Sequence, residues 1–79
     1  MDTPEDLDPL LAKVAAEAGG TVHRDYSGRF MFGATCVGIA GDNLAAILEA
    51  AGARGLRGAR HDQLGKGWIV YWPHLRLPN

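Results

Sequence analysis

Residues 41–55 constrain the fold most, because they encode one short amphipathic helix that needs a surface to pack against. Asp42 or Asn43 can accept a hydrogen bond from a first-turn N–H, so we expect the helix to begin at about residue 43. Apolar side chains then recur at the i, i+3, i+4, i+7 spacing of one helical stripe. They are Leu44, Ile47, Leu48 and Ala51. A helix of about three turns is marginal alone, so the strand-like segments on either side must cover this stripe.

The remaining elements follow from periodicity and from the positions of glycine and proline. Leucine and valine at helical spacing predict a helix over residues 6–18, before Gly19 and Gly20. Strands are predicted over residues 21–25, 34–39, 56–60 and 68–72, with a glycine-bearing hairpin loop at 62–67. The last strand has the strongest signal, since it contains only β-branched and aromatic residues. This order predicts an α+β fold, an antiparallel sheet of about four strands with two helices on one face.

A chain of 79 residues is expected to form a single domain, with residues 1–5 as a flexible acidic leader and residues 74–79 as an extended tail. A domain of this size buries only about 60% of the surface of its unfolded chain, so a homodimer that covers more apolar surface remains an open alternative.

The same sequence argues for a cytoplasmic protein. Its start is acidic, unlike a signal peptide. The longest run of apolar and small residues, 30–41, has 12 positions, whereas about 20 are needed to span a bilayer. The single cysteine, Cys36, cannot close an internal disulfide and suits a reducing compartment. We therefore expect no membrane segment.

Positive charge is concentrated outside the leader. Residues 9–79 carry eight basic and five acidic side chains, although the whole chain has a formal net charge of −1. Five basic side chains are expected around one hairpin, namely Arg54, Arg57, Arg60, His61 and Lys66. Such a cluster can recognise phosphate or carboxylate groups. The alternative is a set of solvated surface side chains.

Two tryptophans share one side of the last predicted strand. Trp68 and Trp72 lie on that side, and Ile69 and Tyr71 lie on the other. In one interpretation, Ile69 and Tyr71 pack under the helices while the tryptophans shield the opposite surface. In the other, Trp68 and Trp72 form an exposed aromatic anchor for a partner.

A third candidate surface surrounds the turn at residues 26–29. Tyr26, Arg29 and Phe32 interleave aromatic and basic character, and could stack on bases or fill a pocket of a partner. Alternatively, Phe30 and Phe32 cap the core beneath a long hairpin loop, and we favour one phenylalanine inside and one outside.

Catalysis has little support in the sequence. Cys36 lies in an apolar strand, where a lone cysteine is usually an inert small hydrophobe. His23, His61 and His74 show no metal-ligand spacing, and no phosphate-binding or dinucleotide-binding glycine motif occurs. We expect no catalytic residue, no metal and no cofactor.

Four short motifs carry a resemblance to a known group of proteins. They are Tyr26-Ser27-Gly28-Arg29-x-Met31-Phe32-Gly33, Cys36-x-Gly38-Ile39, Gly58-Ala59-Arg60 and Ile69-Val70-Tyr71-Trp72-Pro73. Over residues 21–73 the chain resembles small phage and prophage-encoded proteins, among them anti-CRISPR inhibitors of type I CRISPR surveillance complexes. The motifs are structural and transfer no active site.

The resemblance implies a non-enzymatic protein that binds the RNA-guided complex and hinders its access to target DNA. The resemblance leaves the subtype of the type I CRISPR complex open, and subtype I-C is the one considered. Because residues 9–79 are basic, simple imitation of a DNA phosphate chain is not expected. The alternative from the residues alone is a small nucleic-acid-binding regulatory protein that uses Arg54, Arg57, Arg60 and Lys66.

Overall fold

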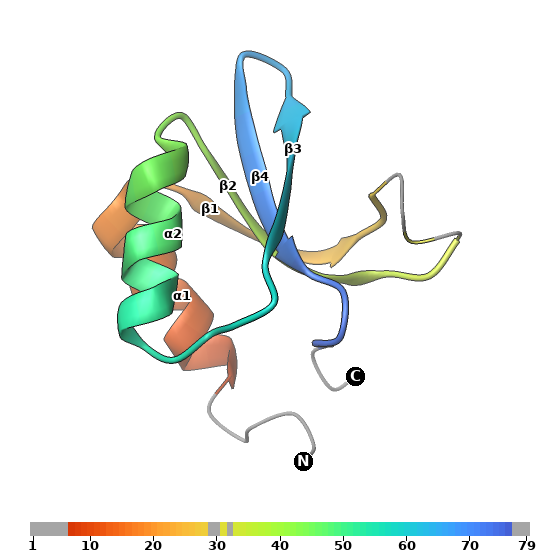
Figure 1. Ribbon diagram of the computed structural model, residues 1–79, viewed down its shortest axis with the longest axis horizontal. Coiled ribbons are helices and arrows are strands. Elements are labelled where there is room, and N and C mark those ends of the chain that lie inside the picture. Colours follow the sequence, from red (N-terminus) through yellow and green to blue (C-terminus); the bar gives the residue numbers. More distant parts are fainter. Residues whose placement is uncertain (1–6, 29–30, 32, 77–79) are drawn as a thin grey trace.

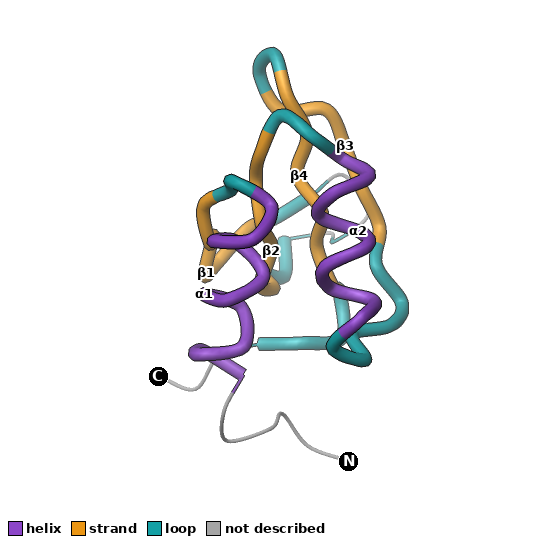
Figure 2. Tube along the Cα trace, turned by 90° about the vertical axis from the view of Figure 1, so that its left-hand side faces the viewer, coloured by secondary structure: helices purple, strands orange, loops and turns teal. Residues whose placement is uncertain are grey.

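The computed structural model describes residues 7–28, 31 and 33–76 (Figure 1). Its elements, in chain order, are α1 (Leu7–Ala18), β1 (Thr21–Tyr26), β2 (Cys36–Gly41), α2 (Leu44–Ala53), β3 (Arg60–Leu64) and β4 (Gly67–Trp72). The strands form one antiparallel sheet in the order β1-β2-β4-β3. The two helices lie side by side against one face of this sheet (Figure 2). The expected α+β class and element order are confirmed.

Local signals define both ends of α2. The side-chain oxygen of Asn43 accepts a hydrogen bond from the Ala46 N–H at 3.1 Å, so Asn43 is the N-cap. At the other end Gly55 has φ +81°, and the Leu56 N–H donates to the Ala51 carbonyl at 3.1 Å. This left-handed glycine satisfies carbonyls that the helix leaves open. The helix passes through Gly52 and ends one residue later.

The predicted third strand is in the wrong place. Residues 56–60 were expected to form it, but β3 covers residues 60–64 and the hairpin turn is only Gly65 and Lys66. Gly55 and Gly58 have φ values of +81° and +78°, which interrupt extended structure before β3. Residues 62–64, expected in the loop, are drawn into the sheet by pairing with β4.

The helix-covered face of the sheet carries the main core. Val70 and Trp72 of β4 lie beside side chains of β2 on this face, under both helices. The fully buried members from the other elements are Leu7, Leu11, Val14, Val37, Ile39 and Ile47. Of the apolar stripe on α2, Leu48 remains 38% exposed, which differs from the expectation that the whole stripe faces the core.

The opposite face carries a second, smaller core. Cys36, Ile69 and Tyr71 are buried there with Met31, which comes from the connection between β1 and β2. Neither interpretation of the last strand anticipated this arrangement. The helices cover one face of β4 and Met31 covers the other. Strand β4 therefore buries the side chains on both of its faces from residue 69 to residue 72.

The chain after β4 turns back toward the sheet. Pro73 and His74 form a turn, the Leu75 N–H donates to the Trp72 carbonyl at 2.9 Å, and the Leu75 carbonyl accepts from the Val37 N–H at 3.1 Å. Of the expected extended tail, His74 lies in this turn and Leu75 is held against β2 by its hydrogen bond with Val37. Neither α1 nor α2, the helices of the described part of the chain, has the length and hydrophobicity of a membrane-spanning segment.

Candidate partner-binding surface

The β3–β4 hairpin, residues 60–72, extends beyond the area that the helices cover (Figure 1). Helix α1 packs on β1 and β2, while α2 packs on β2 and β4. Strand β3 is one of the two outer strands of the sheet. Four of its five residues are exposed, and Asp62 is partly exposed. This hairpin is therefore accessible on both of its faces near the turn.

Trp68 provides a partly exposed indole on the hairpin. It lies opposite Gln63, on the same face of the sheet as Val70. The exposed His61 ring meets the indole edge-on, with centroids 5.8 Å apart and an interplanar angle of 67°. A large aromatic side chain that its own fold covers only in part is the residue type that dominates protein interfaces.

Trp72 corrects the expectation of a two-tryptophan anchor. Its side chain is 0% exposed and belongs to the main core under the helices. The indole Nε1 has no hydrogen-bond partner among the described residues. The pleat places both tryptophans on one face, but only the end of β4 next to the turn leaves the area under the helices. The aromatic surface available to a partner thus contains Trp68 without Trp72.

Tyr26 reaches the other face of the hairpin from β1. Its hydroxyl donates to the Asp62 carboxylate at 3.2 Å, and its ring lies 5.0 Å from that of Tyr71. Burial, followed by the hydrogen bond and charge of Asp62, raises the pKa of Tyr26. Tyr26 is partly exposed at this position and lines one shallow hollow together with His61, Asp62, Gln63 and Trp68.

Tyr71 lies behind Tyr26 in the second core. Its hydroxyl is buried and makes no well-formed hydrogen bond among the described residues, although the Asp62 carboxylate lies close enough to interact with it. Burial, and then the charge of Asp62, raises its pKa, so the hydroxyl stays neutral at physiological pH. The Tyr71 ring fills this face of the sheet, and its neutral hydroxyl offers no ionised group.

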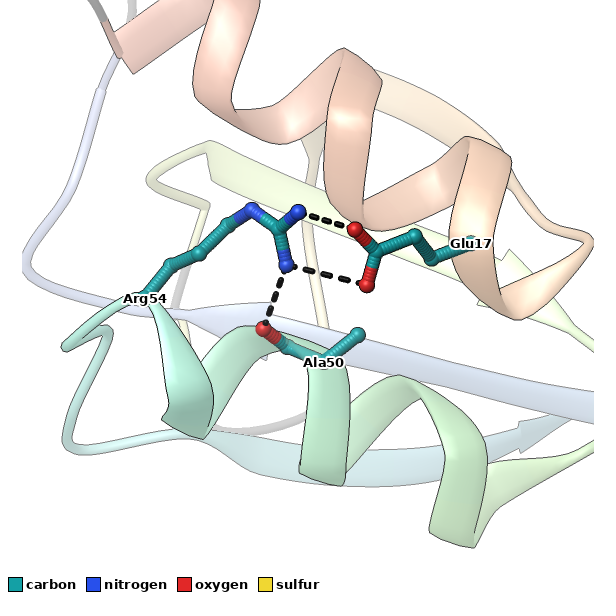
Figure 3. A network of polar contacts seen from close by, with 3 residues as sticks. All are labelled: Glu17, Ala50 and Arg54. Atoms are coloured by element: carbon teal, nitrogen blue, oxygen red, sulfur yellow. Dashed lines mark hydrogen bonds and ion pairs between the residues drawn. The ribbon is translucent and has the colours of Figure 1, made fainter.

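The basic side chains are more dispersed than the sequence predicted. Arg54 is not part of the expected cluster, because its side chain reaches from the end of α2 to Glu17 on α1 (Figure 3). Its Nη1 donates to Glu17 Oε1 at 3.0 Å and to the Ala50 carbonyl at 3.3 Å, and its Nη2 also contacts Glu17. The hydrogen bond between them lowers the pKa of Glu17 and raises that of Arg54. Arg54 therefore belongs to the α1–α2 contact.

The other predicted basic residues remain on the surface. Arg57 lies in the connection before β3, Arg60 and His61 lie on β3, and Lys66 lies in the turn; all four are exposed. Arg29 and Phe32, also predicted to contact a partner, lie outside the described residues. The structure thus brings His61 and Trp68 into ring contact and joins Tyr26 to Asp62, and all four border the same hollow.

Two exposed apolar side chains were not recognised as surface candidates. Leu64, next to the hairpin turn, is 41% exposed, and Leu48 on α2 is 38% exposed. Had Gly65 and Lys66 been recognised as a two-residue hairpin turn, Leu64 would have been identified as the last residue of the strand before that turn. No comparable signal singles out Leu48, since its helical position is that of a core residue.

The described residues offer little chemistry. Cys36 is 1% exposed, and burial raises the pKa of its thiol, which keeps the sulfur protonated and unreactive. Among residues 7–28, 31 and 33–76, no three His, Cys, Asp or Glu side chains are grouped so that they could hold a metal ion.

Comparison with known proteins adds no assignment: no family model matches the chain, and no curated protein or solved structure is significantly similar to it.

Proposed function

We propose that this chain is a non-enzymatic binding protein that docks on a type I CRISPR surveillance complex and hinders its binding of target DNA. The observation that carries the docking surface is the partly exposed Trp68, edge-on to His61 on a hairpin that extends beyond the helices. The identity of the partner is supported by the resemblance of residues 21–73 to phage-encoded inhibitors.

The chemistry of the hairpin suits a protein surface with some acidic character. Trp68 can fill an apolar pocket, while Lys66, in the hairpin turn two residues before it, supplies positive charge beside it. Central aromatic residues of interfaces commonly contribute 2 kcal/mol or more, about thirtyfold in affinity. Charged side chains at the rim mainly accelerate association and set specificity. We therefore assign the affinity to Trp68 and the steering to the basic residues.

The test is a binding competition with a purified, RNA-loaded type I complex. The wild-type chain is expected to co-elute with the complex and to reduce its binding of labelled target DNA. Trp68→Ala should weaken both effects about thirtyfold. Lys13→Ala, which removes an exposed charge on α1, is the control and should behave as wild type.

Three outcomes separate the alternatives. Absence of co-elution together with undiminished DNA binding would reject the proposal. Equal activity of Trp68→Ala and wild type would reject the docking surface and leave the partner in place. Binding of the chain to DNA alone, with an affinity that falls steeply as salt is added, would favour the nucleic-acid-binding alternative.

A further inference from the structure

The two edges of the sheet differ in regularity. Strand β1 pairs with β2 in a register that shifts between His23 and Tyr26. Such an irregularity is a common means of preventing an edge from pairing with another chain. Strand β3 pairs with β4 without interruption over all five residues, from Arg60 to Leu64. Of the two edge strands in the described part of the chain, β3 is therefore the one with a regular outer edge.

The turn determines which backbone groups of β3 point outward. Leu64 and Gly67 flank a two-residue turn and so form a pair joined by two backbone hydrogen bonds. Hydrogen-bonded and non-hydrogen-bonded pairs alternate along an antiparallel ladder. The backbone N–H and C=O groups of Asp62 and Arg60 consequently point to β4. Those of His61 and Gln63 point to the free edge. These groups are ready to bond another strand.

We propose that β3 pairs with β3 of a second copy of this chain, antiparallel about a two-fold axis through His61, to form a continuous eight-stranded sheet. In this register His61 exchanges both backbone hydrogen bonds with the partner's His61. Arg60 lies opposite the partner's Asp62, and Asp62 lies opposite the partner's Arg60. These are non-hydrogen-bonded positions, where facing side chains are closest.

Charge selects this register over its neighbours. In a continuous sheet, side chains that lie opposite each other on two paired strands must point to the same face. The neighbouring registers are therefore those in which the two-fold axis passes through Asp62 or through Arg60. Pairing centred on Asp62 would put two carboxylates face to face, and pairing centred on Arg60 would do the same with two guanidinium groups. Like charges directly opposite are destabilising. The guanidinium of Arg60 has five N–H donors, so it can serve an intramolecular contact and the partner's carboxylate together.

The dimer would join the helix-covered faces of two copies. It would place two Trp68 side chains on one continuous face and so double the surface that we assign to docking; that consequence alone rests on the proposed function. The pairing itself does not, because it is measured without any other partner. A small chain that buries little of its surface gains from such an extension of its sheet.

Sedimentation equilibrium of the purified chain, from micromolar to about millimolar concentration, tests the pairing. The wild-type chain should approach twice its monomer mass of 8.4 kDa. Arg60→Asp and Asp62→Arg each place like charges opposite one another at both symmetric positions, so each should raise the dimer Kd about tenfold or more. The double variant Arg60→Asp/Asp62→Arg restores opposite charges and should restore association.

A backbone variant guards against misfolding, because Asp62 also accepts the Tyr26 hydroxyl. His61→Pro removes an outward N–H and leaves the bonds to β4 intact, as edge strands tolerate. It should give a folded monomer with the wild-type circular dichroism spectrum.

Several results would overturn the pairing. They are a monomer at every concentration of the wild type, a folded double variant that fails to associate, or a folded His61→Pro chain that still forms dimers. A wild-type monomer that binds an extended peptide along β3 would assign the edge to a different protein.

Discussion

The contrast between Trp68 and Trp72 can be tested by stability alone. Both side chains lie on one face of β4, yet Trp72 is 0% exposed and Trp68 is partly exposed. Removing a buried tryptophan to alanine leaves a large cavity and typically costs 3–5 kcal/mol. A chain of 79 residues has a total stability of about 4–12 kcal/mol. Trp72→Ala should therefore remove a large part of the stability, whereas Trp68→Ala should cost no more than about half as much.

Trp72→Phe refines the argument. The Nε1 of Trp72 has no partner among the described residues, and a buried donor of this kind costs about 1–3 kcal/mol. Phenylalanine removes that donor and creates a smaller void than alanine does. The two effects oppose each other, so the net loss should stay within about 1 kcal/mol.

Urea unfolding followed by far-UV circular dichroism measures all three variants, because the signal does not depend on the indoles. With a slope of about 1–1.5 kcal/mol per molar urea, Trp72→Ala should lower the midpoint by about 2 M or more. If Trp72→Ala unfolded at the wild-type midpoint, or if Trp68→Ala were equally destabilised, the assignment of one tryptophan to the core and the other to the surface would be refuted.

Three further predictions follow from burial and backbone geometry. Iodoacetamide should leave Cys36 unmodified in the native chain and alkylate it in urea, because the thiol is enclosed and its pKa is raised; mass spectrometry detects the difference, and rapid native labelling would contradict it. A Cβ at Gly20 would lie 2.5 Å from the Ala40 carbonyl oxygen, whereas one at Gly52 meets nothing within 4 Å. Gly20→Ala should thus lower the urea midpoint, while Gly52→Ala, inside α2, should stabilise by about 0.5–1 kcal/mol; the opposite order would disprove the packing. Burial raises the pKa of Tyr71, so the unfolded chain loses its proton first and stability should decline as pH rises above about 10; unfolding free energies that stay constant through this range would argue against the buried phenol.

Much of the fold was predictable because its signals are local. The Asn43 cap, the apolar spacing of α2 and the β-branched and aromatic run of β4 act within a few residues of one another. Strand β3 was not predictable in the same way. Its sequence, Arg-His-Asp-Gln-Leu, has little intrinsic strand preference, and it is extended because β4 offers a complete ladder to pair with.

The candidate surface was predictable in part. The sequence identified Trp68, His61 and Lys66 as hairpin residues, and the structure leaves them at least partly exposed. It also grouped Arg54 with them, although the partner of Arg54 is Glu17, 37 residues away on the other helix. Contacts between distant residues do not follow from spacing along one segment.

The sequence by itself determined the class of the protein: one small α+β unit with two short helices and an antiparallel sheet, because periodicity and caps specify elements locally. The tertiary structure alone decided which side of β4 the helices cover, since both of its sides are apolar and either could have been buried. The packing of the helices on one face, and of Met31 on the other, enclosed Trp72 and Tyr71 and left Trp68 partly open. Burial in a domain of this size depends on which elements reach a given part of the sheet, and that is a property of the whole chain.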